Sequence, residues 1–414
     1  MTRTAHHPHP TPAFPVYCLD WADDETLILG GGGGASRSGI KNKLKVCKVT
    51  KDGKSVNYLS EFTLSSEEDA PMTLSIDKTG KQMITGVNAS SSIVKDGNNQ
   101  HCRVYKYSEE SVEFVKGQKT IQAEWSDDYP YQKLTSLSPS NKFLAIGTTD
   151  DKVTLLNYPS LDIIIPTFGV DDELVDLDWG GEDGTLLIVT TTKSLYIYQV
   201  KDENTVKLEL KQTIFTPSLD LAPVAFRSAK FSRNSATPLV IHAVLNATRA
   251  AKKGSPRKSF VVSFGLIASS SESPLTDEEL KTLEKHEEDS SPKDSKGEDL
   301  GKWDVIARRE VGTKPVTVFD VSDDGKLLAY GCSDLSIGIL DSKTLAPLLK
   351  ILHAHSFPPT ALKFNSSASL LVSASADNTI RVIVVPASFG GISTSMLAVL
   401  LAILILILAL FLRR

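Results

Sequence analysis

A run of five glycines, Gly30 to Gly34, followed by Asn42, is the stretch of this sequence whose residue types stand out for chemistry. Glycine loses more backbone entropy on folding than any other residue and buries no side chain. A run of glycines therefore indicates unusual backbone dihedrals or a close approach of the backbone to a ligand. No ordinary packing argument explains the run, so we expect it to contact a partner or an ion.

Two nucleotide-binding motifs resemble this run, and the sequence argues against both. The spacing Gly30-x-Gly32-x-x-Ala35 fits a relaxed dinucleotide fingerprint, but that motif must open a helix whose amides hold the pyrophosphate. Residues 36–42 are too few and too rich in Gly and Ser to form that helix. The phosphate-binding Walker motif requires a lysine at the position that Ile40 occupies.

Other residues with catalytic potential favour structural roles. Adjacent acidic residues in turns cap those turns or point apart, which argues against paired-carboxylate catalysis, and the N-terminal histidines lie in a Pro-rich tail without fixed metal geometry. These are Asp23 with Asp24, Asp127 with Asp128, Asp171 with Asp172, and the histidines His6, His7 and His9. No serine nucleophile elbow and no Cys/His arrangement is visible. The pattern indicates a binding platform.

The elements that must position the glycine run belong to an internal repeat. An apolar strand, a polar turn and a second apolar strand ending in small residues recur seven times. The copies begin at Cys18, Thr73, Thr135, Asp176, Ala229, Phe319 and Ala361. A third strand follows most copies, at Arg103, Lys152, Ser194, Ser259, Leu335 and Thr379. In the first copy the strands Thr26–Leu29 and Lys43–Val49 flank the glycine run.

Units of about 40 residues made of short strands predict the blades of a β-propeller. The predicted fold is an all-β, seven-bladed WD-type β-propeller over residues 13–387, after a flexible N-terminus at 1–12. How the ring closes stays open, because the seventh blade has no fourth strand unless the N-terminal residues supply it. His355 and Asp377 are expected to hydrogen-bond within the seventh blade rather than to catalyse a reaction.

Several insertions decorate the ring. The glycine run enlarges the first blade, residues 88–100 enlarge the second, and a basic loop at 249–258 enlarges the fifth. Residues 269–301 are rich in Ser and acidic residues and are predicted to be a mobile insertion, with a short helix at 276–285.

The composition is that of a globular protein, with 41% hydrophobic and 23% charged residues. A net charge of -5 argues against a general nucleic-acid binder, and four scattered cysteines argue against disulfides and zinc. The N-terminus lacks the apolar core of a signal peptide. Residues 392–412 carry no charge and would span roughly 31 Å as a helix, about one hydrocarbon core. We predict one C-terminal transmembrane helix, a lumenal tail at 413–414 and a cytosolic propeller.

Several of these features together resemble one family. They are the loop Gly39-Ile40-Lys41-Asn42-Lys43-Leu44, the run NQHCRVYKY from Asn99, the step Ala354-His355-Ser356-Phe357, the ending SASADNTIRVIVVP and the C-terminal anchor. The chain resembles the endoplasmic-reticulum membrane exchange factors for Sar-type small GTPases, which start COPII coat assembly. Mammalian relatives are called prolactin regulatory element-binding protein. The resemblance covers nearly the whole chain.

The resemblance implies a guanine nucleotide exchange factor that accelerates GDP release without making or breaking a covalent bond, and is therefore not an enzyme in the covalent sense. It implies that Asn42 and the apolar Ile40 drive exchange, and that the GTPase contacts the surrounding loop residues Gly34, Ser36, Arg37, Gly39, Lys41 and Lys43. In that family the loop binds a potassium ion, for which we expect backbone carbonyls of Gly33, Gly34 and Gly39 as ligands. Expected partners are the GTPase, the membrane and COPII assembly factors, but no nucleic acid.

One alternative stays open at this point. A membrane-anchored propeller could act as a passive scaffold for coat or trafficking proteins, accelerating no reaction. That alternative explains the repeats and the anchor but gives the glycines and Asn42 no purpose. From the sequence we also expect Asn42→Ala to abolish most exchange and leave the fold intact, because a loop residue packs against nothing.

Overall fold

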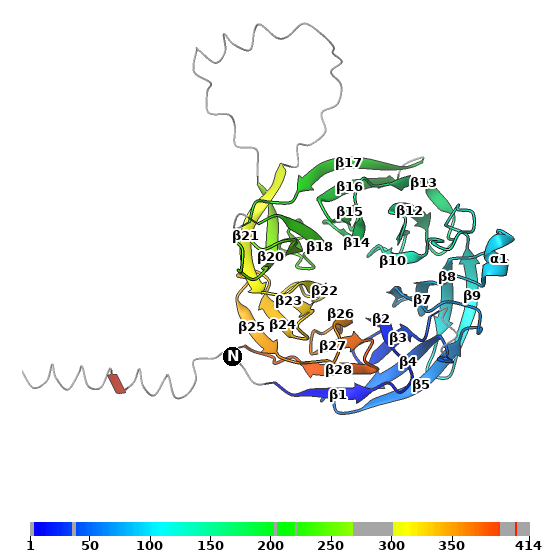
Figure 1. The fold of residues 1–414 in the computed structure, drawn as a ribbon, viewed down its shortest axis with the longest axis horizontal. Coiled ribbons are helices and arrows are strands. Elements are labelled where there is room, and N and C mark those ends of the chain that lie inside the picture. Colours follow the sequence, from blue (N-terminus) through cyan, green and yellow to red (C-terminus); the bar gives the residue numbers. More distant parts are fainter. Residues whose placement is uncertain are drawn as a thin grey trace, which may run out of the picture.

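The computed structural model describes residues 4–34, 39–202, 205–219, 222–267, 301–389 and 402–403. Within these ranges, the strands form seven four-stranded antiparallel sheets. Figure 1 shows the seven sheets arranged as blades around a central axis. The predicted seven-bladed propeller is therefore confirmed.

Each blade runs from an inner strand at the axis to an outer strand at the rim, and blades 1 to 6 use four consecutive strands. Blade 1 consists of β2 (Val16–Trp21), β3 (Thr26–Gly31), β4 (Lys43–Val49) and β5 (Val56–Thr63), and blade 2 of β6 (Leu74–Asp77), β7 (Gln82–Gly86), β8 (Cys102–Tyr107) and β9 (Val112–Gln118). Blade 3 consists of β10 (Gln132–Leu137), β11 (Phe143–Thr148), β12 (Lys152–Asn157) and β13 (Ile163–Gly169), and blade 4 of β14 (Leu174–Gly180), β15 (Leu186–Thr191), β16 (Ser194–Asp202) and β17 (Val206–Phe215). Blade 5 consists of β18 (Val224–Phe231), β19 (Ile241–Ala247), β20 (Ser259–Ile267) and β21 (Lys302–Gly312), and blade 6 of β22 (Val316–Val321), β23 (Leu327–Cys332), β24 (Ile337–Asp341) and β25 (Pro347–Ile351).

Blade 7 closes the ring with strands from both ends of the chain. It consists of β26 (Pro359–Phe364), β27 (Leu370–Ser375), β28 (Thr379–Val384) and, as its outer strand, β1 (His6–Pro10). β1 pairs antiparallel with β28, His6 opposite Ile383 and Pro10 opposite Thr379. The prediction of a flexible N-terminus at 1–12 was therefore wrong for this strand. A Pro-rich segment can still form an edge strand, because an edge strand needs hydrogen bonds on one side only.

The core lies between the blades. The second strand of a blade packs against neighbours on both faces, so strands such as β3, β11, β15 and β27 are buried along their whole length. Inner strands also bond across blades: the indole of Trp21 donates to the carbonyl of Lys363 at 3.2 Å, and Trp179 donates to Ser136 at 2.9 Å. A blade cannot bury both faces alone, so the ring is the cooperative unit.

Charged side chains line the axis in pairs that join neighbouring blades. Lys363 of blade 7 donates to Asp320 of blade 6 at 2.9 Å, and Arg233, just after β18, donates to Asp178 of blade 4 at 2.6 Å. Their carboxylates are almost fully buried. Such pairs are costly to break once formed, because removing one partner leaves a buried charge.

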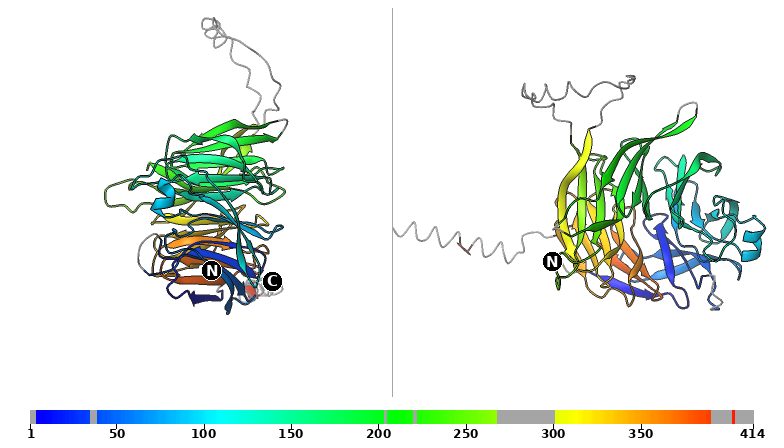
Figure 2. Two further views of the ribbon diagram at one scale, coloured as in Figure 1. Left: turned by 90° about the vertical axis from the view of Figure 1, so that its right-hand side faces the viewer. Right: turned by 45° about the horizontal axis from the view of Figure 1, so that its top comes forward.

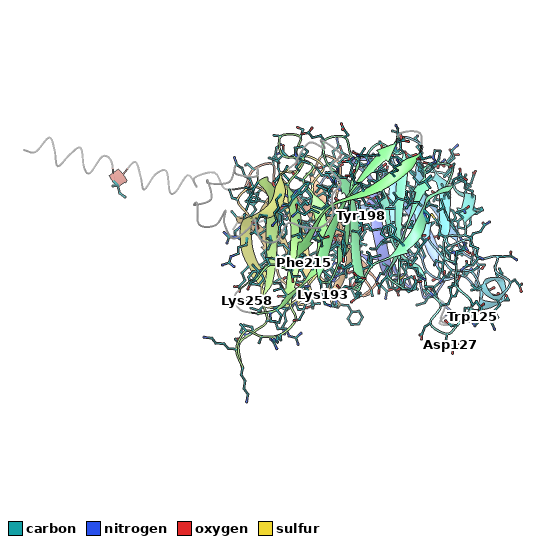
Figure 3. All side chains as sticks on the ribbon, turned by 90° about the horizontal axis from the view of Figure 1, so that it is seen from above. Trp125, Asp127, Lys193, Tyr198, Phe215 and Lys258 are labelled. Atoms are coloured by element: carbon teal, nitrogen blue, oxygen red, sulfur yellow. The ribbon has the colours of Figure 1, made fainter. Side chains whose placement is uncertain are left out.

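Strand direction assigns every connection to one of two faces of the ring. Because the strands alternate in direction, the connections from second to third strands and those between blades share a face, which we call the glycine-loop face. Figure 3 shows the ring edge-on, with Trp125, Asp127, Lys193 and Lys258 toward this face. The short helix α1 (Ser91–Lys95) of blade 2 also lies there. The end of β20, the start of β21 and the end of β28 lie on the opposite face (Figure 2).

Two predicted segments lie largely outside the described residues. These are the insertion at 269–301, of which only Gly301 is described, and the predicted transmembrane helix at 392–412, of which only residues 402–403 are described. Among the described residues, no helix has the length and apolar character needed to cross a membrane.

Candidate functional site

The glycine run leaves the end of β3, and the structure gives its members two different reasons to be glycine. Gly30 and Gly31 belong to β3, and a Cβ on Gly31 would lie 2.0 Å from the carbonyl oxygen of Pro15. The expectation that packing does not explain the run was therefore wrong for this part of it. Gly32 and Gly34 have φ angles of 138° and 70°, which residues with a Cβ rarely adopt. Within the run, the positive φ angles that favour glycine therefore begin at Gly32, where the loop leaves β3.

Asn42 closes the loop from the other side, immediately before β4. Its Oδ1 accepts the N–H of Gly34 at 2.9 Å, and its Nδ2 donates to the carbonyl of Gly34 at 3.0 Å and to the carbonyl of Glu68 at 2.6 Å. Its side chain is 5% exposed. The side-chain amide therefore bonds both the N–H and the carbonyl of Gly34, as the backbone of an adjacent strand would. The expectation that Asn42 packs against nothing was therefore wrong.

Glu68 lies in the connection between blades 1 and 2, and its side chain anchors that connection. Its carboxylate accepts the backbone N–H of Ser65 at 2.8 Å and forms an ion pair with Arg103 of β8. Burial raises the pKa of Glu68, but the hydrogen bonds from Arg103 and Ser65 outweigh burial, so the pKa lies below its usual value. Sequence reasoning missed both residues. A basic side chain within the otherwise buried strand β8 was the available signal, because such a charge requires a carboxylate partner.

The other predicted site residues surround this closure. Gly39 and Lys41 are exposed and Ile40 is half-buried, while Gly33 lies beside Gly34. Lys43 begins β4 and pairs with Glu61 at 2.5 Å. The predicted contact residues Ser36 and Arg37 lie outside the described residues. The loop therefore exposes Gly39 and Lys41, with Ile40 half-buried between them, on a base that Asn42 holds.

A second group of side chains lies on the same face, in blade 2 and in the connection between blades 2 and 3. Lys95 of α1 lies over the ring of Trp125, with Nζ 5.5 Å from the ring centroid, and Trp125 stacks on Tyr129 at 5.9 Å. The Tyr129 hydroxyl lies 2.8 Å from Nε2 of His101. Burial lowers the pKa of His101 to about 4, so this imidazole is neutral near pH 7. The aromatic stack fixes the connection between blades 2 and 3 against blade 2.

His355 has the structural role that the sequence predicted. Its Nε2 lies 2.7 Å from Oγ of Ser373 and its Nδ1 lies 3.0 Å from Oγ1 of Thr379. Asp377 lies 3.4 Å from Nδ1 and accepts the N–H of Ser356. Burial lowers the pKa of His355 to about 4. The prediction of hydrogen bonding within blade 7 is confirmed.

Comparison with known proteins agrees with the propeller fold. The family model of the WD domain, G-beta repeat, matches residues 346–383, which contain β25, β26, β27 and most of β28. The guanine nucleotide-exchange factor SEC12 of Candida glabrata is 25% identical over 390 residues, which are 91% of this chain and 72% of that protein. These matches and the seven blades support a SEC12-type WD-repeat propeller.

Further relatives bear similar names but match less of their own length. The putative guanine nucleotide-exchange factor SED4 of Saccharomyces cerevisiae is 23% identical over 93% of this chain and 31% of that protein. The guanine nucleotide-exchange factor SEC12 of Mus musculus is 24% identical over 53% of this chain and 58% of that protein. The matched regions therefore cover only part of each of these relatives.

Proposed function

We propose that this chain is a guanine nucleotide-exchange factor that activates a Sar-type small GTPase at the endoplasmic reticulum membrane and so starts COPII vesicle formation. The names of its SEC12 relatives support exchange activity, and the family resemblance of the loop supports the GTPase class. The observation that carries the proposal is the glycine loop itself. Its base is fixed by Asn42, while Gly39 and Lys41 are exposed on either side of the half-buried Ile40.

The proposed activity requires this site to bind the GTPase and does not involve cleavage of a covalent bond. A protein that binds the nucleotide-free GTPase more tightly than the GDP form must, by linkage, weaken GDP binding by the same factor. Ile40 and Lys41 would contact the GTPase, with Gly39, Lys43 and the predicted residues Ser36 and Arg37 around them. Asn42 would act by holding the loop, because its amide already bonds Gly34 and Glu68. GTP then reloads the emptied site.

A potassium ion fits the donor types of the loop. Backbone carbonyls of Gly33, Gly34 and Gly39 are oxygen ligands suited to a large, weakly hydrated cation, and the carboxylate of Asp69 lies beside Gly34. Within the described part of the chain, no three His, Cys, Asp or Glu side chains gather into a metal site, so backbone oxygens are the donors to consider. The ion would add fixed positive charge that stabilises the loop. Exchange should then be faster in potassium than in sodium buffer.

Attachment to the membrane would concentrate the reaction at one surface. An anchor at 392–412 would follow β28, which ends on the face opposite the glycine loop, and so would leave that loop open to the cytosol (Figure 2). A GTPase activated there inserts into the same bilayer, and the shared surface raises its effective concentration. COPII assembly factors would meet the activated GTPase at that surface.

Nucleotide-dependent binding tests the proposal. The full chain in detergent is immobilised and offered a purified Sar-type GTPase, either stripped of nucleotide or loaded with GDP. We expect retention of the stripped form and its release on addition of GDP or GTP. Equal retention of both forms, unaffected by added nucleotide, would instead identify a passive scaffold.

A further inference from the structure

The connection between blades 1 and 2, residues 64–73, lies against the base of the glycine loop. The N–H of Leu64 donates to the carbonyl of Asn42 at 2.9 Å, and the carbonyl of Glu68 accepts Nδ2 of Asn42 at 2.6 Å. Asn42 is therefore tied to this connection through both its backbone and its side chain. Any movement of Glu68 moves a hydrogen-bond acceptor on which Asn42 depends.

Glu68 is in turn fixed by Arg103, a residue of the next blade. The two side chains form an ion pair in which the Glu68 side chain is 19% exposed and the Arg103 side chain 10% exposed. Arg103 also donates through Nε to the carbonyl of Gln100 at 3.0 Å. Arg103 thereby joins the connection at 64–73 to the connection at 87–101 that contains α1.

We propose that Glu68 and Arg103 are positioning residues for the glycine loop, acting through Asn42 to hold the loop in the conformation that the GTPase recognises. The bonds form one continuous path from Arg103 to the Glu68 carboxylate, then through the Glu68 carbonyl to Asn42 and finally to Gly34. The importance of this pair for exchange rests on the proposed function. The effect of the pair on the conformation of the loop does not depend on the proposed function.

The need for such a support follows from the loop's composition. A glycine-rich segment has many accessible conformations and no side chains with which to build a core of its own. Contacts at its base must therefore select one conformation, which lowers the entropy lost when a partner binds. The pair is well suited to this task, because Phe62 and Tyr105 line the same surface pocket and make its surroundings partly apolar. Charges interact more strongly where water is partly excluded.

The test compares three variants of the full chain in detergent. Glu68→Gln removes the charge but keeps the backbone carbonyl that binds Asn42, and Arg103→Lys keeps the charge but loses the forked geometry of the guanidinium. The control is Asp178→Asn, which disrupts the buried ion pair with Arg233 between blades 4 and 5. It weakens the ring by the same chemistry, away from the glycine loop.

The first readout is hydrogen exchange of the Gly34 amide, measured without GTPase. We expect its protection to fall about tenfold in Glu68→Gln and in Arg103→Lys, as for a weakened buried hydrogen bond, and to stay unchanged in Asp178→Asn. The second readout is GDP release at saturating GTPase. We expect kcat to fall about tenfold in the same two variants, with a smaller change in KM, because the exposed Gly39 and Lys41 still offer their contacts.

The two readouts separate the failure of this inference from the failure of the proposed function. If wild-type chain does not accelerate GDP release but Gly34 loses protection in Glu68→Gln, the exchange function fails and the positioning of the loop stands. Unchanged Gly34 protection in folded Glu68→Gln overturns the inference. If Glu68→Gln does not fold, Arg103→Lys decides by the same criterion.

Discussion

Replacing Asn42 by alanine removes three hydrogen bonds at the base of the glycine loop. The Gly34 N–H, the Gly34 carbonyl and the Glu68 carbonyl each lose a partner. A hydrogen bond of this kind contributes about 0.5–1.5 kcal/mol net, and water can reach the half-exposed Gly34 to replace part of the loss. We therefore expect the loop conformation to lose about 2 kcal/mol, or about 30-fold in the protection of the Gly34 amide.

The assay combines hydrogen exchange at Gly34 with GDP release from the GTPase. Asn42→Asp extends the series, because it replaces the Nδ2 donor by an oxygen that faces two carbonyl oxygens. We expect it to loosen the loop at least as much as alanine does. The matched control is Asn365→Ala, because Asn365 is also buried and uses its amide on the backbone, donating to Asp24 and accepting from Leu370. This control should lower the free energy of unfolding while leaving Gly34 protection and GDP release unchanged.

One result would refute the reasoning on Asn42. If Asn42→Ala abolishes GDP release while Gly34 keeps its full protection, the amide acts directly on the GTPase and not through the loop. A direct role of Asn42 in driving exchange is what the family resemblance implied.

Four other perturbations address the loop, the seventh blade and the ion pair. Gly32→Ala should loosen the loop and lower exchange, because its Cβ would lie 2.3 Å from Oδ1 of Asn42; hydrogen exchange and GDP release measure both effects, and unaltered behaviour would contradict this loop geometry. His355→Ala should cost about 2–4 kcal/mol in denaturant unfolding, because its buried ring fills space and bonds two hydroxyls, yet should not change exchange per folded molecule. Deleting residues 1–10 should lower the melting temperature, since it removes the outer strand of blade 7; an unchanged melting temperature would contradict the ring closure. The pKa of Glu68 is lowered in the folded protein, so the stability from its ion pair is fully present above the usual glutamate pKa of 4.5 and is lost as pH falls through the folded pKa. Protection of the loop against a protease should therefore decrease in that acid range in wild type but not in Glu68→Gln.

The repeat pattern was enough to predict the blades, because inner strands that pack on both sides leave continuous apolar runs between polar turns. The strand Lys43–Val49 was predicted with the bounds that the structure gives to β4. The N-terminal strand β1 was not, since its Pro- and His-rich sequence has no apolar alternation. Its pairing with β28 depends on an open edge that only the assembled ring creates.

The site was predictable in type but not in its internal bonds. The run of five glycines and the nearby Asn42 were enough to single out the loop. The sequence could not reveal that Asn42 uses its amide on Gly34 and Glu68, because Glu68 is distant in the chain and reaches Asn42 through its carbonyl, which every residue possesses. The same limit applies to Arg103, whose partner is set by the way blade 2 packs beside blade 1.

The most direct test of the exchange function is the rate of GDP release from a purified Sar-type GTPase, measured with and without saturating full-length chain in potassium buffer. We predict release far faster than the intrinsic rate of the GTPase, with most of the acceleration lost in Asn42→Ala. Release at the intrinsic rate, with the chain folded and the GTPase competent to exchange nucleotide, would contradict the proposed function.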